Sequence, residues 1–256
     1  MTLEKPSEEK GKRMSTKYCD RESNLRTKRN DSDISLFHDL AREYDAWFDR
    51  EGRPSFSIEV QAFRDILPSL PKPWLEIGVG SGRFAQALGI ETGVDPWLGL
   101  AQIARRKGIN TFVRPAEQEL FDEESFGTVF LIATLCFLSS PVDVLKEANR
   151  ILIPGGKLVL GFVLKESPWG QFYEVKKAQR HRFYRYAIFY RCREVVRLLV
   201  QAGFVIEKIM STLFQKPGEV QHVEEPRLGY SPDAGFMIIV AGKRMTTTKD
   251  VKKDYC

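Results

Sequence analysis

The sequence predicts an α/β fold built on a doubly wound, mostly parallel sheet with helices on both faces. Short apolar runs alternate with helical patterns over most of the chain, which is typical of successive βαβ units. A glycine-rich turn, GVGSG, follows the first apolar run directly, and acids lie at the ends of the first and second runs. In a parallel sheet such ends face a shared crevice, so the same pattern predicts a ligand site.

Two helices are expected before the sheet. Residues 35–48, SLFHDLAREYDAWF, form an amphipathic pattern that Ser35 is suited to cap at its N-terminus. Residues 57–67, SIEVQAFRDIL, form a second helical pattern, which ends before the prolines of PSLPKP.

The elements of the sheet follow in order. The apolar runs are WLEIGV, TGVD, TFVRP, FGTVFLIATLCFL and GGKLVLGFV, and the helical patterns between them begin at Arg83, Leu98 and Pro141. Residues 165–190 form a longer, irregular, aromatic-rich insertion. The helix REVVRLLVQAG then ends at Gly203, and two final runs, FVIEKIMSTLF and GFMIIVAGKR, are expected to form an antiparallel addition at the sheet edge.

Charge and hydropathy divide the chain into one domain and two tails. Residues 1–33 contain nine Lys/Arg and seven Asp/Glu, and residues 243–256 contain five and two. Both segments have too little apolar surface to bury, so we expect disordered tails around a single domain at residues 34–242, with N-terminal helices at 34–70. This domain carries 25 charges of each sign, which argues against a domain-wide footprint for nucleic acid.

The composition argues against several other classes of protein. No run of 18 apolar residues that would span a bilayer is present, and the N-terminus lacks the apolar core of a secretory signal. The four cysteines lie far apart without CxxC or Cys/His spacing, which argues against a zinc site or a disulfide framework. We therefore predict a cytoplasmic protein without a membrane segment or a metal, and the oligomeric state stays open.

The glycine-rich turn allows three interpretations. A dinucleotide site requires G-x-G-x-x-G, but Gly78, Gly80 and Gly82 form G-x-G-x-G, and Arg83 stands where the third dinucleotide glycine belongs. A P-loop requires a Lys-Ser or Lys-Thr pair, which does not follow this turn. The glycines alone would also fit a tight turn without any ligand.

Acids around the turn favour a ligand. Glu76 precedes the first glycine by two residues, and Asp95 ends the second apolar run, where an acid can accept both hydroxyls of a ribose. Ala116 and Glu117 follow the third run beside the same crevice. This set suits a ligand that carries a positive charge and a sugar but no phosphates.

The segments LEIGVGSGRFA, GVDPWLGL, AEQELFDEESFGTVF and VLKEANRILIPGGKLVLGF together resemble the class I S-adenosylmethionine-dependent methyltransferases, in particular their type-11 group. The resemblance extends over residues 37–242. It implies a Rossmann-like, doubly wound seven-stranded sheet of order 3-2-1-4-5-7-6, with strand 7 antiparallel and an N-terminal helical lid. It also implies S-adenosylmethionine as the cofactor.

The resemblance further implies roles for individual residues. The glycine-rich turn would lie under the methionine part of the cofactor, which Glu76 would help to orient, and Asp95 would hold the ribose hydroxyls. The remaining implied contacts are Pro96 on the adenine face, Ala116 and Glu117 at the adenine edge, Ala133 and Thr134 beside the transferable methyl, and Tyr44 in the lid.

Residues that would contact the methyl acceptor are harder to identify from the sequence. Tyr44 and Trp47 are predicted to close over the cofactor as lid aromatics, although their spacing with Leu40 also fits the buried stripe of a helix. Further candidates for the substrate pocket are Phe137, Trp169, Tyr173 and, as a general base, His181. No catalytic residue is identified, because an in-line methyl transfer depends mainly on alignment and desolvation.

A basic stretch at residues 176–197 carries eight Lys/Arg and one acid, with aromatic residues among them. It fits a nucleic-acid patch, a cap over an anionic or aromatic substrate, or an insertion whose aromatics pack while its arginines reach solvent.

The sequence therefore predicts a methyltransferase that acts on a small molecule. One alternative is a methyltransferase-like protein that binds cofactor or recruits a partner without turnover. Another is an RNA methyltransferase that uses residues 176–197. Against the RNA alternative, the domain is electrically neutral and lacks the N/D-P-P-Y/F motif that positions an amino group of a base.

Overall fold

The computed structural model describes residues 40–119 and 121–244. The predicted cap Ser35, the predicted tail 1–33 and nearly all of the predicted tail 243–256 lie outside the described residues. Residues 40–47 are helical. The domain boundaries assigned from the sequence stay predictions.

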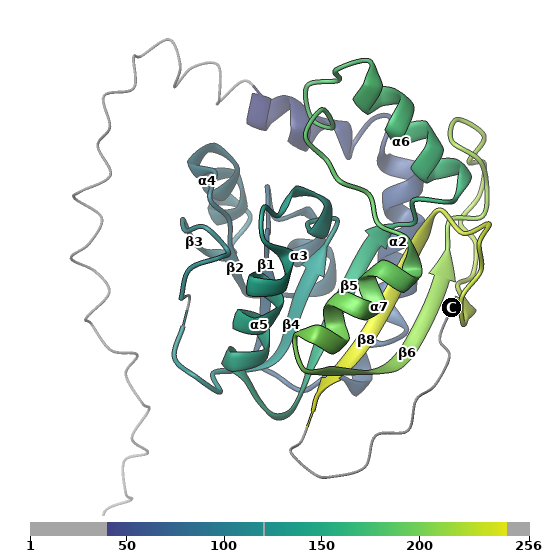
Figure 1. The fold of residues 1–256 in the computed structure, drawn as a ribbon. Helices are drawn as coiled ribbons and strands as arrows, with labels where there is room; N and C mark the ends of the chain where they lie inside the picture. The colour runs from purple at the N-terminus through teal and green to yellow at the C-terminus, as the bar shows by residue number, and fades with distance from the viewer. Residues whose placement is uncertain (1–39, 120, 245–256) are drawn as a thin grey trace, which may run out of the picture. The chain divides into compact units, whose positions relative to one another are not determined.

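An eight-stranded sheet forms the centre of the fold, in the order β3-β2-β1-β4-β5-β8-β6-β7 (Figure 1). Its strands are β1 (Trp74–Ile77), β2 (Thr92–Val94), β3 (Asn110–Phe112), β4 (Phe126–Ile132), β5 (Leu152–Val163), β6 (Phe204–Thr212), β7 (Arg227–Leu228) and β8 (Phe236–Lys243). The strands from β3 to β5 pair in parallel, and β8 pairs antiparallel with both β5 and β6. The predicted order with an antiparallel seventh strand is confirmed, with β8 in that place. The two-residue β7 is an addition that the sequence analysis did not expect.

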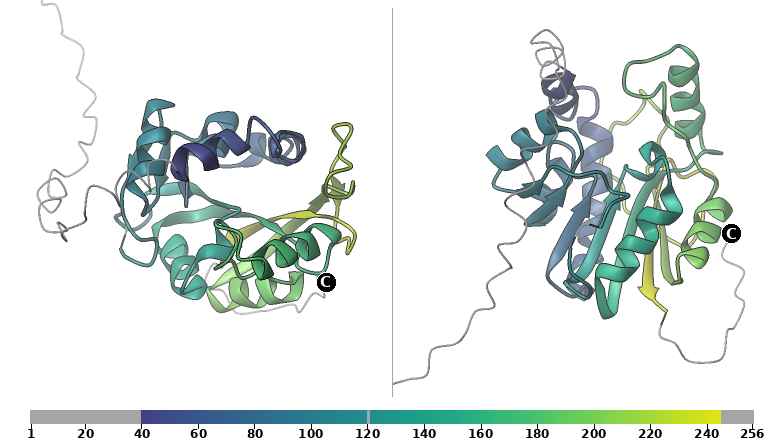
Figure 2. Two further views of the ribbon diagram at one scale, coloured as in Figure 1. Left: turned by 90° about the horizontal axis from the view of Figure 1, so that it is seen from above. Right: turned by 60° about the vertical axis from the view of Figure 1, so that its left-hand side comes forward.

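Helices cover both faces of this sheet (Figure 1, Figure 2). One face carries α5 (Pro141–Ile151) and α7 (Cys192–Gln201), and the other carries α2 (Arg53–Arg64), α3 (Arg83–Leu88) and α4 (Leu98–Arg106). Strand β4 shows the division, because Val129 and Leu131 pack with the first set of helices and Phe130 and Ile132 with the second. This alternation follows from the two-residue period of a strand.

Turn-forming residues set the ends of these elements. Helices α2, α5 and α6 (Pro168–Ala178) each have a proline in the first turn, where its missing N–H is tolerated. Gly203 follows α7 with a φ of 84°, which ends the helix in the left-handed conformation that glycine favours.

Two differences from the sequence predictions appear. Helix α2 begins before the predicted range of 57–67 and ends at Arg64, after which Leu67–Ser69 form a 3-10 turn, η2. The insertion at 165–190 contains the regular helix α6. Cys136 is a free thiol. Within the described residues, no helix is long and apolar enough to cross a membrane, and no cluster of His, Cys, Asp and Glu could hold a metal ion.

Candidate functional site

The carboxyl ends of β1, β2 and β4 bring the predicted cofactor residues together. Strand β1 lies between β2 and β4, so the strand order reverses there. Glu76 lies in β1, Asp95 directly follows β2, and Ala133 and Thr134 directly follow β4. In open α/β sheets, ligands bind in the crevice beyond such a reversal.

The glycine-rich turn requires glycine for two separate reasons. Gly78, Gly80 and Gly82 have φ angles of 75°, 53° and 78°, in the left-handed region that residues with a Cβ disfavour. At Gly78 a Cβ would also lie only 2.2 Å from Cγ2 of Thr134. Oγ1 of Thr134 donates a hydrogen bond of 3.2 Å to the carbonyl oxygen of Gly78, so the turn is attached directly to the end of β4.

Asp95 is fixed by two backbone amides. The N–H of Gly80 donates to Oδ2 and that of Trp97 to Oδ1, each at 2.9 Å. The side chain is 6% exposed, and burial raises the pKa of Asp95 to about 6, although these hydrogen bonds lower it. Because an ionised carboxylate has about four acceptor sites, roughly two remain for the hydroxyls of a ligand.

Glu76 is the second buried acid of the site. It is 1% exposed, and its Oε2 has no hydrogen-bond partner among the described residues. Burial raises the pKa of Glu76 well above its usual value, and the nearby charge of Asp95 raises it further. Within residues 40–119 and 121–244 neither acid forms an ion pair. Two neighbouring buried carboxyls either stay partly protonated or receive a positively charged ligand.

The N-terminal helix places Tyr44 over the glycine-rich turn. Cε1 of Tyr44 lies 3.7 Å from the position that a Cβ on Gly80 would occupy. The ring of Tyr44 packs edge-on against Phe48 and Phe183, with centroids 5.5 Å and 5.6 Å away. Burial, and then the nearby Tyr184, raises the pKa of Tyr44 above its usual value, so its hydroxyl is neutral and able to donate.

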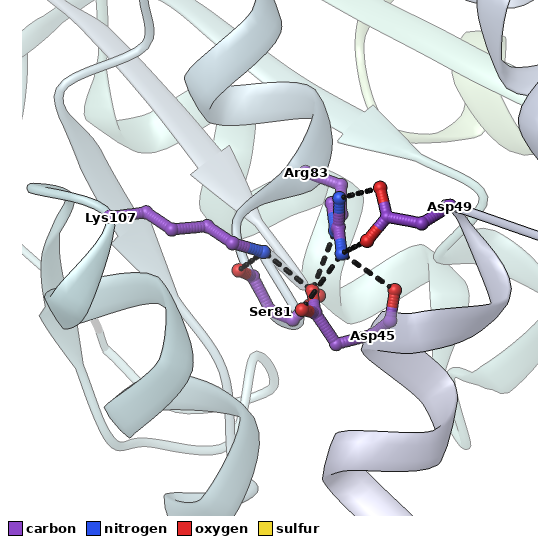
Figure 3. A network of polar contacts seen from close by, with 5 residues as sticks. All are labelled: Asp45, Asp49, Ser81, Arg83 and Lys107. Atoms are coloured by element: carbon purple, nitrogen blue, oxygen red, sulfur yellow. Dashed lines mark hydrogen bonds and ion pairs between the residues drawn. The ribbon is translucent and has the colours of Figure 1, made fainter.

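A network of charges attaches this helix to the turn (Figure 3). Arg83, at the start of α3, donates to both carboxylate oxygens of Asp45 at 2.7 Å and 2.9 Å, and to those of Asp49 at 2.7 Å and 2.6 Å. Lys107, which follows α4, donates to Asp45 and to the carbonyl oxygen of Ser81. Burial raises the pKa of Asp45, but the hydrogen bonds from Arg83 and Lys107 outweigh it and hold the pKa below its usual value. Arg83, which stands where a dinucleotide site would have its third glycine, therefore holds the N-terminal helix against the turn.

The other predicted cofactor residues have different surroundings. Pro96 is exposed directly after Asp95, and Ala116 is buried at 6% exposed. Glu117 is exposed and accepts a hydrogen bond of 2.7 Å from Oγ of Ser139. Ala133 has a φ of 53°, which is uncommon for a residue with a Cβ and places local strain at the end of β4.

Two of the predicted substrate-pocket residues meet at Tyr184, which sequence reasoning missed. The ring of Tyr173 lies 4.6 Å from that of Tyr184, and the ring of His181 lies 5.1 Å from it on a nearly parallel plane. Burial, and then the charges of Lys176 and Arg182, lowers the pKa of His181, so its imidazole is neutral at pH 7.

The other three residues predicted for the substrate pocket lie in separate surroundings. Trp47 packs over Gly52, where a Cβ would lie 2.3 Å from its ring. Trp169 is 7% exposed, and its indole N–H donates to the carbonyl oxygen of Gln215 at 2.7 Å. Phe137, in the 3-10 turn η3 (Leu135–Phe137), is 49% exposed. Their predicted roles at the substrate pocket stay predictions.

Known proteins with similar sequences and structures define the class. A family model described as a methyltransferase domain matches residues 75–160. A crystal structure of an S-adenosylmethionine-dependent methyltransferase from Thermotoga maritima, described as a "possible histamine N-methyltransferase", is 37% identical to this chain. It aligns with a TM-score of 0.75 over 82% of this chain and 99% of its own.

Two uncharacterised proteins are also similar. One from Mycobacterium tuberculosis is 38% identical over 82% of this chain and 74% of its own length. One from Methanocaldococcus jannaschii is 36% identical over 82% of this chain and 100% of its own. A protein described as a "putative methyltransferase", in complex with the Trm112 methyltransferase activator of Haloferax volcanii, shares the fold at 16% identity and a TM-score of 0.58.

The fold and the site define a class I α/β methyltransferase. The chain belongs to the S-adenosylmethionine-dependent methyltransferases, and S-adenosylmethionine is its cofactor. The residues present fit this cofactor, which carries a sulfonium and an ammonium group. Glu76 and Asp95 are buried acids without a cationic partner in the described part of the chain, and Oε2 of Glu76 lacks a hydrogen bond there.

Proposed function

We propose that the protein transfers the methyl group of S-adenosylmethionine to a small-molecule acceptor. The observation that carries the proposal is the pair of buried acids at the strand reversal, Glu76 and Asp95, whose negative charge has no partner among the described residues. A glycine-rich turn with three left-handed glycines lies between these two acids in the sequence. A buried ligand with positive charge and ribose hydroxyls satisfies this set.

We propose the following roles for the residues of the site. Asp95, already held by two amides, accepts the ribose hydroxyls, and Glu76 orients the ammonium group. The adenine and methionine contacts proposed in addition are Pro96, Ala116, Glu117, Ala133 and Thr134. Tyr44 closes over the turn as part of a lid that Arg83 and Lys107 hold in place.

The bound cofactor supplies an electrophilic methyl group on a sulfonium. Glu76 and Asp95 would hold the cofactor so that this methyl group is available for in-line transfer to an electron pair of an acceptor beside Ala133 and Thr134. The task of this chain is to align the acceptor and to exclude water, which lowers the barrier without a dedicated catalytic group. Where the acceptor atom must lose a proton, the neutral His181 is a candidate base.

A small acceptor is favoured over RNA by the charges of the insertion. In the basic stretch, Arg182 pairs with Glu43, and Lys176 and Arg185 lie over aromatic rings at 4.8 Å and 4.7 Å. These cations therefore have partners within the domain. Because the relative from Thermotoga maritima is described as a possible histamine N-methyltransferase, amines are the first acceptor class to screen.

Calorimetric titration with S-adenosylmethionine and S-adenosylhomocysteine, on the wild type and on Asp95→Ala, tests the proposal. We expect micromolar binding that the substitution weakens at least about 100-fold, because a buried hydrogen-bonding acid is lost. A screen with labelled methyl groups on small amines, alcohols, thiols and RNA then identifies the acceptor class. A folded wild type that binds neither compound would contradict the proposal. Binding without transfer to any acceptor would favour the non-catalytic alternative.

A further inference from the structure

Glu59 occupies an unusual position for a charged residue. It lies in α2 one turn after Ser55 and one turn before Ala62 and Phe63, and these three residues are at most 4% exposed. Residues three and four apart share one face of a helix, so Glu59 lies on the stripe by which α2 packs into the fold. Glu59 itself is half-buried.

The carboxyl group of Glu59 has no partner among the residues that the structure describes. No hydrogen bond or ion pair reaches it from residues 40–119 or 121–244. Burial raises the pKa of Glu59 to about 8, since no neighbouring cation or donor opposes this effect. A desolvated acid without a partner lowers the stability of a fold, and such groups concentrate at ligand sites.

Two tyrosines of the insertion lie near Glu59. Burial raises the pKa of Tyr173 and of Tyr184, and the charge of Glu59 raises both further. The two rings lie 4.6 Å apart. Phe189 stacks on the ring of Tyr173, with centroids 5.9 Å apart and planes 21° from parallel. Glu59 therefore lies near an ordered group of packed aromatic rings.

The same aromatic group extends to the cofactor site. Tyr44, Tyr173 and Tyr184 belong to one hydrophobic cluster together with the buried residues of α2. The charge of Glu59 acts on Tyr173 and Tyr184, whereas that of Asp95 acts on Tyr44. Ring contacts lead from Tyr173 through Tyr184, His181 and Phe183 to Tyr44, so the aromatic group connects the neighbourhood of Glu59 with the cofactor site.

Building on the proposed methyltransferase function, we propose that Glu59, Tyr173 and Tyr184 form the acceptor subsite, and that the acceptor carries a basic nitrogen. A protonated amine pairs with the Glu59 carboxylate and lies against the tyrosine rings through cation–π contacts. A carboxylate or phosphate at this position is excluded by repulsion from the acid. Because a protonated nitrogen has no electron pair to give, the methyl group goes to another nucleophilic atom of the same acceptor.

Calorimetric titration with a matched pair of probes, phenethylamine and phenethyl alcohol, tests the subsite. The full-length protein is used with S-adenosylhomocysteine present, as wild type, Glu59→Gln and Glu59→Leu. We expect the amine to bind the wild type at least about tenfold more tightly than the alcohol, because only the amine forms a charged hydrogen bond. This ratio should fall to about one in both variants. Glu43→Gln, which neutralises an exposed acid of the N-terminal helix, should keep the ratio of the wild type.

Equal binding of amine and alcohol by the wild type, or an unchanged ratio in both Glu59 variants, would overturn the subsite. Glu59→Leu keeps the test decisive if Glu59→Gln fails to fold, because leucine suits an apolar stripe. Titration of the same samples with S-adenosylmethionine separates the two proposals. If the wild type does not bind the cofactor, the proposed function is contradicted. If the wild type binds the cofactor but does not prefer the amine to the alcohol, only the acceptor subsite is contradicted.

Discussion

The charge network that docks the N-terminal helix leads to a quantitative prediction. Asp45→Asn would remove the negative charge that Arg83 and Lys107 share while nearly keeping the shape of the side chain. The side chains of Asp45, Arg83 and Lys107 are only 19%, 17% and 16% exposed. At an effective dielectric constant near 20, two unit charges 4 Å apart attract by about 4 kcal/mol, and desolvation offsets part of this attraction. We expect Asp45→Asn to lower the free energy of unfolding by about 2 to 3 kcal/mol.

Asp49→Asn is a matched control for this prediction. Asp49 pairs with the same guanidinium, but its side chain is 66% exposed. Exposed ion pairs contribute about 0 to 1 kcal/mol, so Asp49→Asn should cost less than about 1 kcal/mol. The difference between the two variants isolates the effect of burial and of the second cation, because both substitutions remove one carboxylate from Arg83.

Urea unfolding and calorimetric titration with S-adenosylmethionine are the assays. Tyr44 directly precedes Asp45, so release of the helix removes the ring from the glycine-rich turn. If a docking energy of about 2 kcal/mol is fully coupled to binding, Asp45→Asn weakens cofactor affinity about 30-fold, and Asp49→Asn weakens it less than about fivefold. Faster amide exchange at residues 40–52 should accompany the loss in Asp45→Asn. Equal effects of the two substitutions would refute the reasoning, as would unchanged stability and affinity in Asp45→Asn.

Three further predictions concern the turn and the buried acids. Gly78→Ala and Gly89→Ala both place alanine at a φ of 75°, but only at Gly78 would the Cβ meet Thr134, at 2.2 Å. Urea unfolding should therefore show a loss of about 1 to 2 kcal/mol for Gly89→Ala and a clearly larger one for Gly78→Ala, and equal losses would contradict the close contact. Binding of the cationic cofactor should lower the raised pKa of Asp95 from about 6 and release protons near that pH, so the calorimetric enthalpy should vary with the ionisation enthalpy of the buffer. The pKa of Glu59 is about 8 in the folded protein and 4.5 in the unfolded chain. The stability that the protonated carboxyl contributes is therefore fully present below pH 4.5 and is lost as the pH rises through 8. Thermal melts should therefore show Glu59→Gln more stable than the wild type at pH 8 to 9, and a lower melting temperature of the variant there would count against a buried, unpartnered acid.

The residues proposed for the cofactor site could be selected from the sequence because local backbone geometry sets their positions. Gly78, Gly80 and Gly82 have left-handed φ angles that few other residues adopt, and Asp95 ends a short strand, so the sequence spacing itself carries the information. The role of Arg83 could not be predicted, because its partner Asp45 is 38 residues away in the sequence.

Helix α6 and Glu59, near the proposed acceptor subsite, were not identified from the sequence for other reasons. Helix α6 was not expected, because its many aromatic residues obscure the helical period, although Ser167 and Pro168 gave a start signal. The structure shows the Gly170 N–H donating to Oγ of Ser167 at 3.0 Å. Glu59 gave a readable signal, an acid among apolar residues at helical spacing. The sequence does not show which face of that helix is buried, so the acid also fitted a solvent-exposed position.

Two kinds of buried or half-buried acid can be distinguished in this protein by their partners. Asp45 is matched by Arg83 and Lys107, and its charge therefore stabilises the attachment of the N-terminal helix. Asp95 and Glu59 have no cationic partner among the described residues, and burial raises the pKa of both. An acid with a cationic partner stabilises the fold as a carboxylate. An acid without one lowers the stability of the fold until a positively charged ligand binds. Neutralising substitutions should therefore have opposite signs at neutral to alkaline pH, destabilising at Asp45 and stabilising at Glu59, and this contrast locates ligand positions without knowledge of the ligand.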